Sequence, residues 1–231
     1  MPSPRTPSVV TALAAVLALA SAGAGRAAAQ GSTPSSMPGL GVQGDAAAAI
    51  RARADSARYP YTAADVHFMS AMIGHHAQAI VMARWAPTHG ASPSVETLAA
   101  RIINAQQDEI ATMRQWLRDR GQPVPEARPG PMTMVMDGME HDMLMPGMLT
   151  EPQMARLDAA RGSEFDRLFL TFMMQHHRGA VSMVKELFDT YGAAQDETVF
   201  KFASDVNVDQ TTEIARMQRM LAALVFGTDE P

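Results

Sequence analysis

The chain contains no cysteine. This absence excludes structural disulfides, cysteine-ligated zinc or iron–sulfur sites, and a lipid anchor attached through an N-terminal cysteine. Aromatic residues are also few, with 8 Phe, 3 Tyr and 2 Trp against 19 Met. Because thioether sulfur is the soft ligand left to a chain without thiols, this surplus of methionine directs attention to soft metals.

Long apolar runs are missing as well. A membrane-spanning helix needs about 20 apolar residues, and the longest apolar stretch, residues 9–20, has twelve. It follows Arg5 and precedes Ala27-Ala28-Ala29, an order typical of a signal peptide and its cleavage site, with Ala20-Ser21-Ala22 as an alternative site. We therefore expect residues 1–29 to be removed on export and the mature protein to be periplasmic or secreted, without stable membrane insertion.

Basic residues are fewer than acidic ones. The chain has 19 Lys and Arg against 24 Asp and Glu. Removal of residues 1–29 takes away Arg5 and Arg26 but no acid, which moves the net charge from −5 to −7. A phosphate-binding surface needs a basic face, so we expect no nucleic-acid partner. The negative charge is compatible with cation binding.

Strand patterns are scarce, and the pattern that is present is helical and repeated. Two segments match at a constant offset of 101: Asp65, Phe68, Met72, His75, His76, Ala79 and Met82 correspond to Asp166, Phe169, Met173, His176, His177, Ala180 and Met183. A second helical pattern, Gln-x-x-Glu-Ile-x-x-Met-x-x-x-Leu, follows each copy and begins at Gln106 and Gln210. Two repeated helical hairpins predict an all-α, pseudo-symmetric four-helix bundle.

Turn and capping residues set the boundaries of these segments. We expect a disordered linker with a short helix at 30–60, the first hairpin at 61–122, a Met-rich connecting loop at 123–160 and the second hairpin at 161–225. Thr62 with Asp65 and Ser163 with Asp166 have the spacing of a capping box. The two Asp residues then belong to helix N-termini, where negative charge is favoured.

The repeat carries a candidate metal-binding set. Successive helical residues lie about 100° apart, so each copy places its Met and His on neighbouring stripes. Packing each hairpin would bring thioethers, imidazoles and one carboxylate together. The candidate ligands are Met72, His75, His76, Met82, Glu109 and Met113 in the first hairpin, Met173, His176, His177, Met183, Glu213 and Met217 in the second, and His141 in the connecting loop.

Ligand softness indicates which metal such a set would bind. Thioether sulfur favours Cu(I) over zinc, calcium or magnesium, whereas imidazole binds either oxidation state of copper. Copper is therefore the predicted metal, with Cu(I) preferred and Cu(II) as an alternative. Metals with oxygen ligands need more carboxylates than each repeat offers. A di-iron site needs a Glu-x-x-His motif on two helices, and the sequence has none.

Structural roles compete with metal binding for several residues. A Met stripe at helical spacing is more often core packing than a ligand set, which applies to Met69, Met113 and Met217. Glu109 and Glu213 would in one alternative only hydrogen-bond the imidazoles.

His67, His89 and the methionines of the connecting segment lie outside the matched helix positions. His67 and His89 have no counterpart in the other copy, and we expect both at the surface. The seven Met between Pro131 and Thr150 follow no helical period. This irregular spacing favours a flexible segment that collects soft metal.

The second copy and its flanks resemble a known family. Residues 165–183, the following Gln210-x-x-Glu213-Ile214-x-x-Met217 and the preceding 148–157 are similar to the signature of the proteins with domain of unknown function 305. The resemblance covers about residues 60–225. The first copy departs from it at Ala77-Gln78, where the second has Arg178-Gly179, and this departure predicts a weaker or differently shaped first site.

Membership of this family would imply a ferritin-like helical bundle exported by bacteria. The family includes periplasmic copper-binding proteins of the CopM type, linked to copper tolerance. The resemblance therefore implies binding of copper, and of silver as an alternative. The residues carried over by position are Met72, His75, His76, Met82, Met173, His176, His177 and Met183.

These observations predict an exported copper-binding protein that sequesters or delivers copper and catalyses no reaction. Its partners would be metal ions and other periplasmic copper-handling proteins. One alternative is a metal-dependent redox enzyme, a cuprous oxidase, which would turn over Cu(I) under oxygen. Another is a helical interaction module without metal, whose partner binding would survive chelation.

Overall fold

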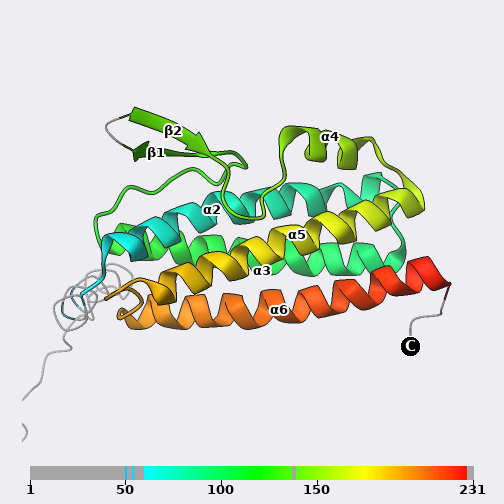
Figure 1. Cartoon of the computed structure of the whole chain (residues 1–231). Helices are drawn as coiled ribbons and strands as arrows, with labels where there is room; N and C mark the ends of the chain where they lie inside the picture. The colour runs from blue at the N-terminus through cyan, green and yellow to red at the C-terminus, as the bar shows by residue number, and fades with distance from the viewer. Residues whose placement is uncertain (1–49, 51–53, 55–59, 137–138, 228–231) are drawn as a thin grey trace, which may run out of the picture. The chain divides into compact units, whose positions relative to one another are not determined.

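Four long helices dominate the computed structural model, which describes residues 50, 54, 60–136 and 139–227. They are α2 (Ala63–Arg84), α3 (Pro93–Asp119), α5 (Gly162–Asp189) and α6 (Glu197–Phe226) (Figure 1). The predicted all-α class is confirmed. The predicted signal peptide and almost all of the predicted linker at 30–60 lie outside the described residues.

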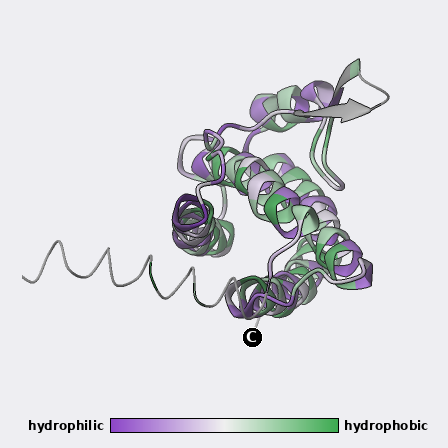
Figure 2. Ribbon diagram, turned by 90° about the vertical axis from the view of Figure 1, so that its left-hand side faces the viewer, coloured by the Kyte–Doolittle hydropathy of each residue, from purple (hydrophilic) through white to green (hydrophobic). Residues whose placement is uncertain are grey.

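The helices pair as the repeat predicts. α2 packs most extensively on α3, and α5 on α6, while α2 and α5 join the two hairpins. A short 3-10 helix, η1 (Ala86–Thr88), lies in the first hairpin turn. α2 and α5 run in opposite directions (Figure 1), and Figure 2 looks along the bundle at four helices around one interior. Large side chains fill that interior: Phe165, Phe169, Leu98 and Ile102 are almost fully buried.

The two repeated Asp residues connect the hairpins to each other. Thr62 and Asp65 form the predicted capping box at the start of α2, with Asp65 Oδ2 accepting from Thr62 N at 2.7 Å. The other oxygen, Asp65 Oδ1, accepts from Ala194 N in the turn of the second hairpin at 2.7 Å. In the reverse direction, Asp166 accepts from Ser92 N in the turn of the first hairpin at 3.1 Å.

The prediction of a capping box at Ser163 and Asp166 is wrong. α5 begins two residues earlier than this cap would place it, at Gly162, and its N-cap Arg161 makes no side-chain capping bond. The backbone N–H of Ser92 lies close enough to bind the Asp166 carboxylate instead. A contact between hairpins therefore replaces the local cap that the spacing suggested.

The connecting segment at 123–160 is more structured than the predicted loop. It contains the antiparallel strands β1 (Met132–Met136) and β2 (Met139–Met143), with Met132 opposite Met143, and the helix α4 (Glu151–Ala159). Of the ten strand residues, only Thr133 and Val135 belong to the types enriched in strands, so the strand signal of the hairpin was weak. A signal for α4 was present, because Thr150 and Gln153 form a capping box at its start.

Candidate metal centre

The two His-His pairs meet at the contact between α2 and α5. His75 and His76 come from α2, His176 and His177 from α5, and all four side chains are fully buried. The rings of His75 and His176 lie 3.8 Å apart between centroids, at an interplanar angle of 39°. Within each pair the centroids are 6.3 and 6.2 Å apart. The structure thus brings the pairs of both copies to one place in the interior.

A backbone carbonyl fixes the proton on each of the two central rings. His75 Nε2 donates to Pro146 O at 3.0 Å, and His176 Nε2 donates to His75 O at 3.0 Å. A carbonyl oxygen can only accept, so the Nε2 atom of each ring must carry the proton. In a neutral imidazole the Nδ1 atom then keeps its lone pair.

A carboxylate holds each of the two outer rings in the same way. His76 Nε2 contacts Glu109 Oε2 on α3 at 2.7 Å, and His177 Nε2 contacts Glu213 Oε2 on α6 at 2.7 Å. The two glutamate side chains are 17% and 16% exposed, so each carboxylate reaches from the bundle surface to a buried ring. The predicted hydrogen bond between each Glu and an imidazole is present in both copies.

The Nδ1 atoms of all four rings are buried and find no hydrogen-bond partner in the described part of the chain. Buried polar atoms without partners cost free energy, and such atoms are rare in folded proteins. Metal-binding imidazoles commonly donate one ring N–H to a carboxylate or carbonyl and leave the other nitrogen for the metal. The four rings therefore have the hydrogen bonding of metal ligands.

Burial keeps the two central rings neutral. It lowers the pKa of His75 from 6.5 to about 3, with a further contribution from repulsion by His76 and a partial offset from the hydrogen bond to Pro146. Burial also lowers the pKa of His176 well below 6.5, together with repulsion by His75 and the other two rings. Both central rings thus offer an unprotonated Nδ1 at neutral pH.

The buried thioethers form two groups that the simple hairpin prediction did not anticipate. Met183 of the second copy packs in the same buried cluster as Met72 and Met113 of the first. Met82 of the first copy packs in the cluster of Met173 and Met217. α2 and α5 run in opposite directions (Figure 1) and contact each other at His75 and His176. The Met after each His pair therefore lies in a cluster that contains thioethers of the other hairpin. Each group therefore draws on both copies.

His67 and His89 differ in position. His67 is exposed, as predicted. The prediction for His89 is wrong, because it is only 5% exposed. Its Nε2 donates to Asp158 O at 2.9 Å and its Nδ1 contacts Thr88 Oγ1 at 2.9 Å. Both ring nitrogens are engaged, and His89 fastens the turn after α2 to the end of α4, a helix that the sequence prediction lacked.

The departure of the first copy from the family pattern has a structural reason. The connecting segment passes so close to α5 that a Cβ on Gly179 would lie 1.9 Å from Pro146 O. At the matching position of α2, Gln78 accepts from Leu149 N at 2.7 Å and donates to Leu149 O at 3.0 Å. Both residues therefore hold the same connecting segment. Sequence comparison of the two copies could not reveal this, since the partner lies about 70 residues away from Gln78.

The donor chemistry narrows the choice of metal. Among the described residues, no three His, Asp or Glu side chains gather as a metal-binding group. The further soft donors in this interior are the thioether sulfurs of buried methionines, which suit Cu(I) and other soft ions. His141 lies in β2, and its side chain is outside the described part of the structure.

The fold and the interior define a four-helix bundle with imidazoles and thioethers at its centre. Residues 65–221 match the model of the family named Domain of unknown function (DUF305), and the chain belongs to this family. A curated relative, an uncharacterized protein of Acanthamoeba polyphaga mimivirus, is 38% identical over 56 residues, which is 24% of this chain. That match spans 37% of the relative's length.

Several solved structures are similar to this chain over most of their own length. A secreted DUF305 protein from Streptomyces coelicolor is 28% identical, with 73% of this chain and 96% of that chain covered and a TM-score of 0.59. A DUF305 fragment from Deinococcus radiodurans is 30% identical, with 71% and 98% covered and a TM-score of 0.58. CopM in its Cu(II)-bound form is 29% identical, with 68% and 95% covered and a TM-score of 0.51. CopM has also been solved in Cu(I)-bound and Ag-bound forms.

Proposed function

We propose that this chain is an exported copper-binding protein that sequesters or delivers copper through the histidines and methionines of its interior. Membership of the DUF305 family and similarity to CopM, which was solved with Cu(I), Cu(II) and Ag, support a copper-related role. None of the described helices is both long and apolar enough to cross a membrane. The similarity to a secreted protein and the signal-peptide pattern support export to the periplasm or beyond.

The arrangement of the four imidazoles carries this proposal. Each ring has its Nε2 held by an acceptor and its Nδ1 buried without a partner. A histidine that served only to stabilise the core would be expected to use both nitrogens, as His89 does. The same hydrogen bonding at four positions is more readily explained by metal binding than by packing.

The proposed ligands are the four Nδ1 atoms together with buried thioethers. Met72, Met113 and Met183 would serve on one side, and Met82, Met173 and Met217 on the other. Glu109 and Glu213 would orient and polarise the outer rings without binding the metal themselves. This donor set favours Cu(I) and Ag(I), and the imidazoles also accommodate Cu(II).

Competition against a cuprous chelator tests the proposal. We expect the double variants His75→Ala/His76→Ala and His176→Ala/His177→Ala to lose most of the Cu(I) affinity of the parent. His89→Gln is the matched control, because His89 is buried but outside the site, and it should bind copper as the parent does. Helical circular dichroism reports whether each variant folds. Equal Cu(I) affinity in the parent and both folded double variants would refute the proposal.

Removing the charge of the two glutamates gives a test that opens no cavity. In Glu109→Gln/Glu213→Gln, the amide oxygen can still accept from Nε2–H, but the negative charge that raises ring basicity is gone. We expect Cu(I) affinity to fall about 10- to 100-fold, the range for partners of metal ligands. Asp108→Asn, which removes a charge beside Glu109, is the control for a general loss of negative charge. Oxygen uptake measured on the copper-loaded parent separates stoichiometric binding from oxidase turnover.

A further inference from the structure

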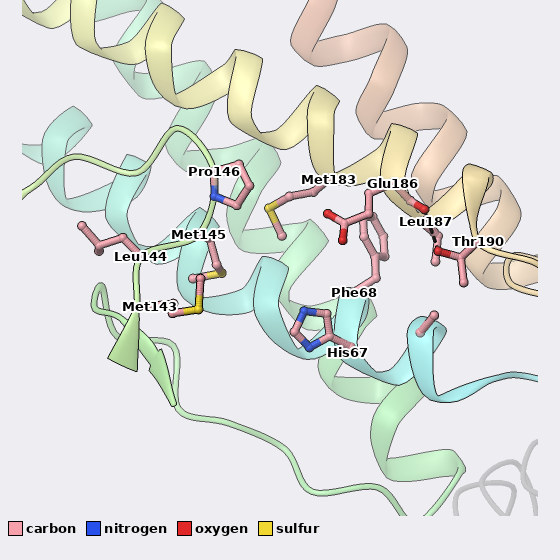
Figure 3. Close-up of a pocket in the computed structure, with 11 residues that line it drawn as sticks. His67, Phe68, Met143, Leu144, Met145, Pro146, Met183, Glu186, Leu187 and Thr190 are labelled. Carbon is pink, nitrogen blue, oxygen red and sulfur yellow. Dashed lines mark hydrogen bonds between the residues drawn. The ribbon is translucent and has the colours of Figure 1, made fainter. Parts of the chain in front are cut away.

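Three thioethers line a pocket at the surface. The pocket has a volume of about 340 Å³, and we call it the outer pocket; its chemically distinctive lining residues are His67, Met143, Met145, Met183 and Glu186. Figure 3 shows these side chains bordering one cavity. They come from four places in the chain, since His67 lies on α2, Met143 ends β2, Met145 follows it, and α5 carries the other two.

We propose that the outer pocket is an entry site for Cu(I), which it binds before the ion reaches the buried imidazoles. This inference rests on the proposed function. Three thioethers and an imidazole form a soft donor set, and the carboxylate of Glu186 adds negative charge beside it. The pocket has room for rearrangement, and methionine has three rotatable bonds that let its sulfur move toward an ion.

The exposure of the three thioethers decreases from the surface inward. Met143 is 47% exposed, Met145 9% and Met183 6%. Core packing does not account for Met143, because a side chain that is almost half exposed removes little apolar surface from water. An exposed thioether above two nearly buried ones is instead suited to capture an ion at the surface and retain it below.

The pocket is continuous with the proposed buried site. Met145 and Met183 line the pocket and also belong to the buried cluster that contains Met72 and Met113. Pro146 lines the pocket too, and its carbonyl accepts the hydrogen bond from His75 Nε2. An ion bound by Met183 would therefore have the buried thioethers and the central imidazoles as its next donors.

The outer pocket belongs to one end of the pseudo-symmetric bundle. The repeat places Leu168 at the position of His67, and Met143 and Met145 lie in the connecting segment, which occurs once. The second copy thus lacks the imidazole and both thioethers that the connecting segment supplies. Entry through the outer pocket would make the two halves of the bundle unequal, with the ion arriving first at the half that contains Met72.

Silver titration of the purified protein, with the methionine methyl groups labelled with carbon-13 and observed by NMR, tests this inference. Ag(I) substitutes for Cu(I) without being oxidised. We expect the methyl signals of Met143, Met145 and Met183 to shift in the early additions. Met139 is the matched control, because it is 61% exposed on the same strand and lies outside the pocket, and its signal should stay in place.

The variant Met143→Leu/Met145→Leu keeps the apolar volume and removes two sulfurs. We expect the early shift of Met183 to be lost in this variant, while Met82 and Met173 still respond to added silver. In the parent, early shifts only of methionines outside the pocket, with Met143 unchanged, would overturn the assignment of the outer pocket as an entry site. An equal response from Met139 would do the same. Either result would leave the proposed function standing. A parent in which no methionine signal responds to silver would overturn both.

Discussion

Gly179→Ala is expected to lower the free energy of unfolding by more than about 3 kcal/mol, at the upper end of the cost of overpacking. The new Cβ would lie 1.9 Å from Pro146 O and 2.6 Å from Gly147 Cα. These are backbone atoms, so no side-chain rotation relieves the clash, and the connecting segment must move away from α5. Urea unfolding followed by circular dichroism measures the loss.

Gly74→Ala is the control for this substitution. It also lies within a helix, but its added Cβ would meet nothing closer than 3.4 Å. Alanine is favoured over glycine inside a helix by about 1 kcal/mol, so this variant should be as stable as the parent or more so. If both variants unfold at the same urea concentration, the connecting segment does not pack against α5 as closely as described.

The same substitution should also affect the metal. Displacing Pro146 removes the acceptor of His75 Nε2, and the ring is then free to change its tautomer. We therefore expect Gly179→Ala to weaken Cu(I) binding even under conditions in which it remains folded. Gln78→Ala should have a smaller effect on both properties, because it removes two hydrogen bonds to Leu149 without creating a clash.

Gly179 and Gln78 occupy matching helix positions but contact the connecting segment in different ways, which the sequence alone did not predict. The repeat predicted four helices, their pairing in two hairpins and the stripes that carry the Met and His residues, because helical spacing encodes which residues share a face. It could not predict what the connecting segment contacts. The difference at residues 78 and 179 was interpreted as a weaker or differently shaped first site, and that stays a prediction; the structure adds that both residues contact the connecting segment.

The sequence also did not predict which residues of the two hairpins contact each other. Each hairpin was expected to collect its own thioethers, but Met82 and Met183 each share a buried cluster with thioethers of the opposite hairpin. Asp166 was assigned to a local cap and instead binds Ser92. Both outcomes depend on how α2 crosses α5, and a sequence period defines the face of a helix but not the partner of that face.

Acidification should destabilise the metal-free protein strongly. His75 and His176 are neutral in the folded state because their pKa values lie below 6.5, at about 3 for His75. In the unfolded chain both would take up a proton near the ordinary value. As the pH falls below about 6.5, the unfolded state therefore binds more protons than the folded state, and stability decreases until the pH reaches the folded-state pKa.

The size of this effect follows from the pKa of His75. One pKa unit is worth about 1.4 kcal/mol. Because His75 is already half protonated in the unfolded chain at pH 6.5, it alone should remove about 2 kcal/mol between pH 6.5 and 4.5. His176 adds a loss in the same direction. A domain with a total stability of about 5–15 kcal/mol then loses a substantial part of that stability by pH 4.5. Thermal unfolding of the metal-free protein across this pH range measures the loss.

The double variant His75→Gln/His176→Gln separates the histidines from other titrating groups. Glutamine has no proton to gain in this range, and its side-chain N–H groups can still donate to carbonyls such as Pro146 O. We expect this variant to lose much less stability than the parent between pH 6.5 and 4.5. Identical slopes in the parent and the double variant would mean that the two central rings do not cause the acid sensitivity. Since the same burial that makes these rings costly to protonate also keeps their Nδ1 lone pairs available, acid sensitivity of the fold and readiness to bind a soft metal have one physical origin.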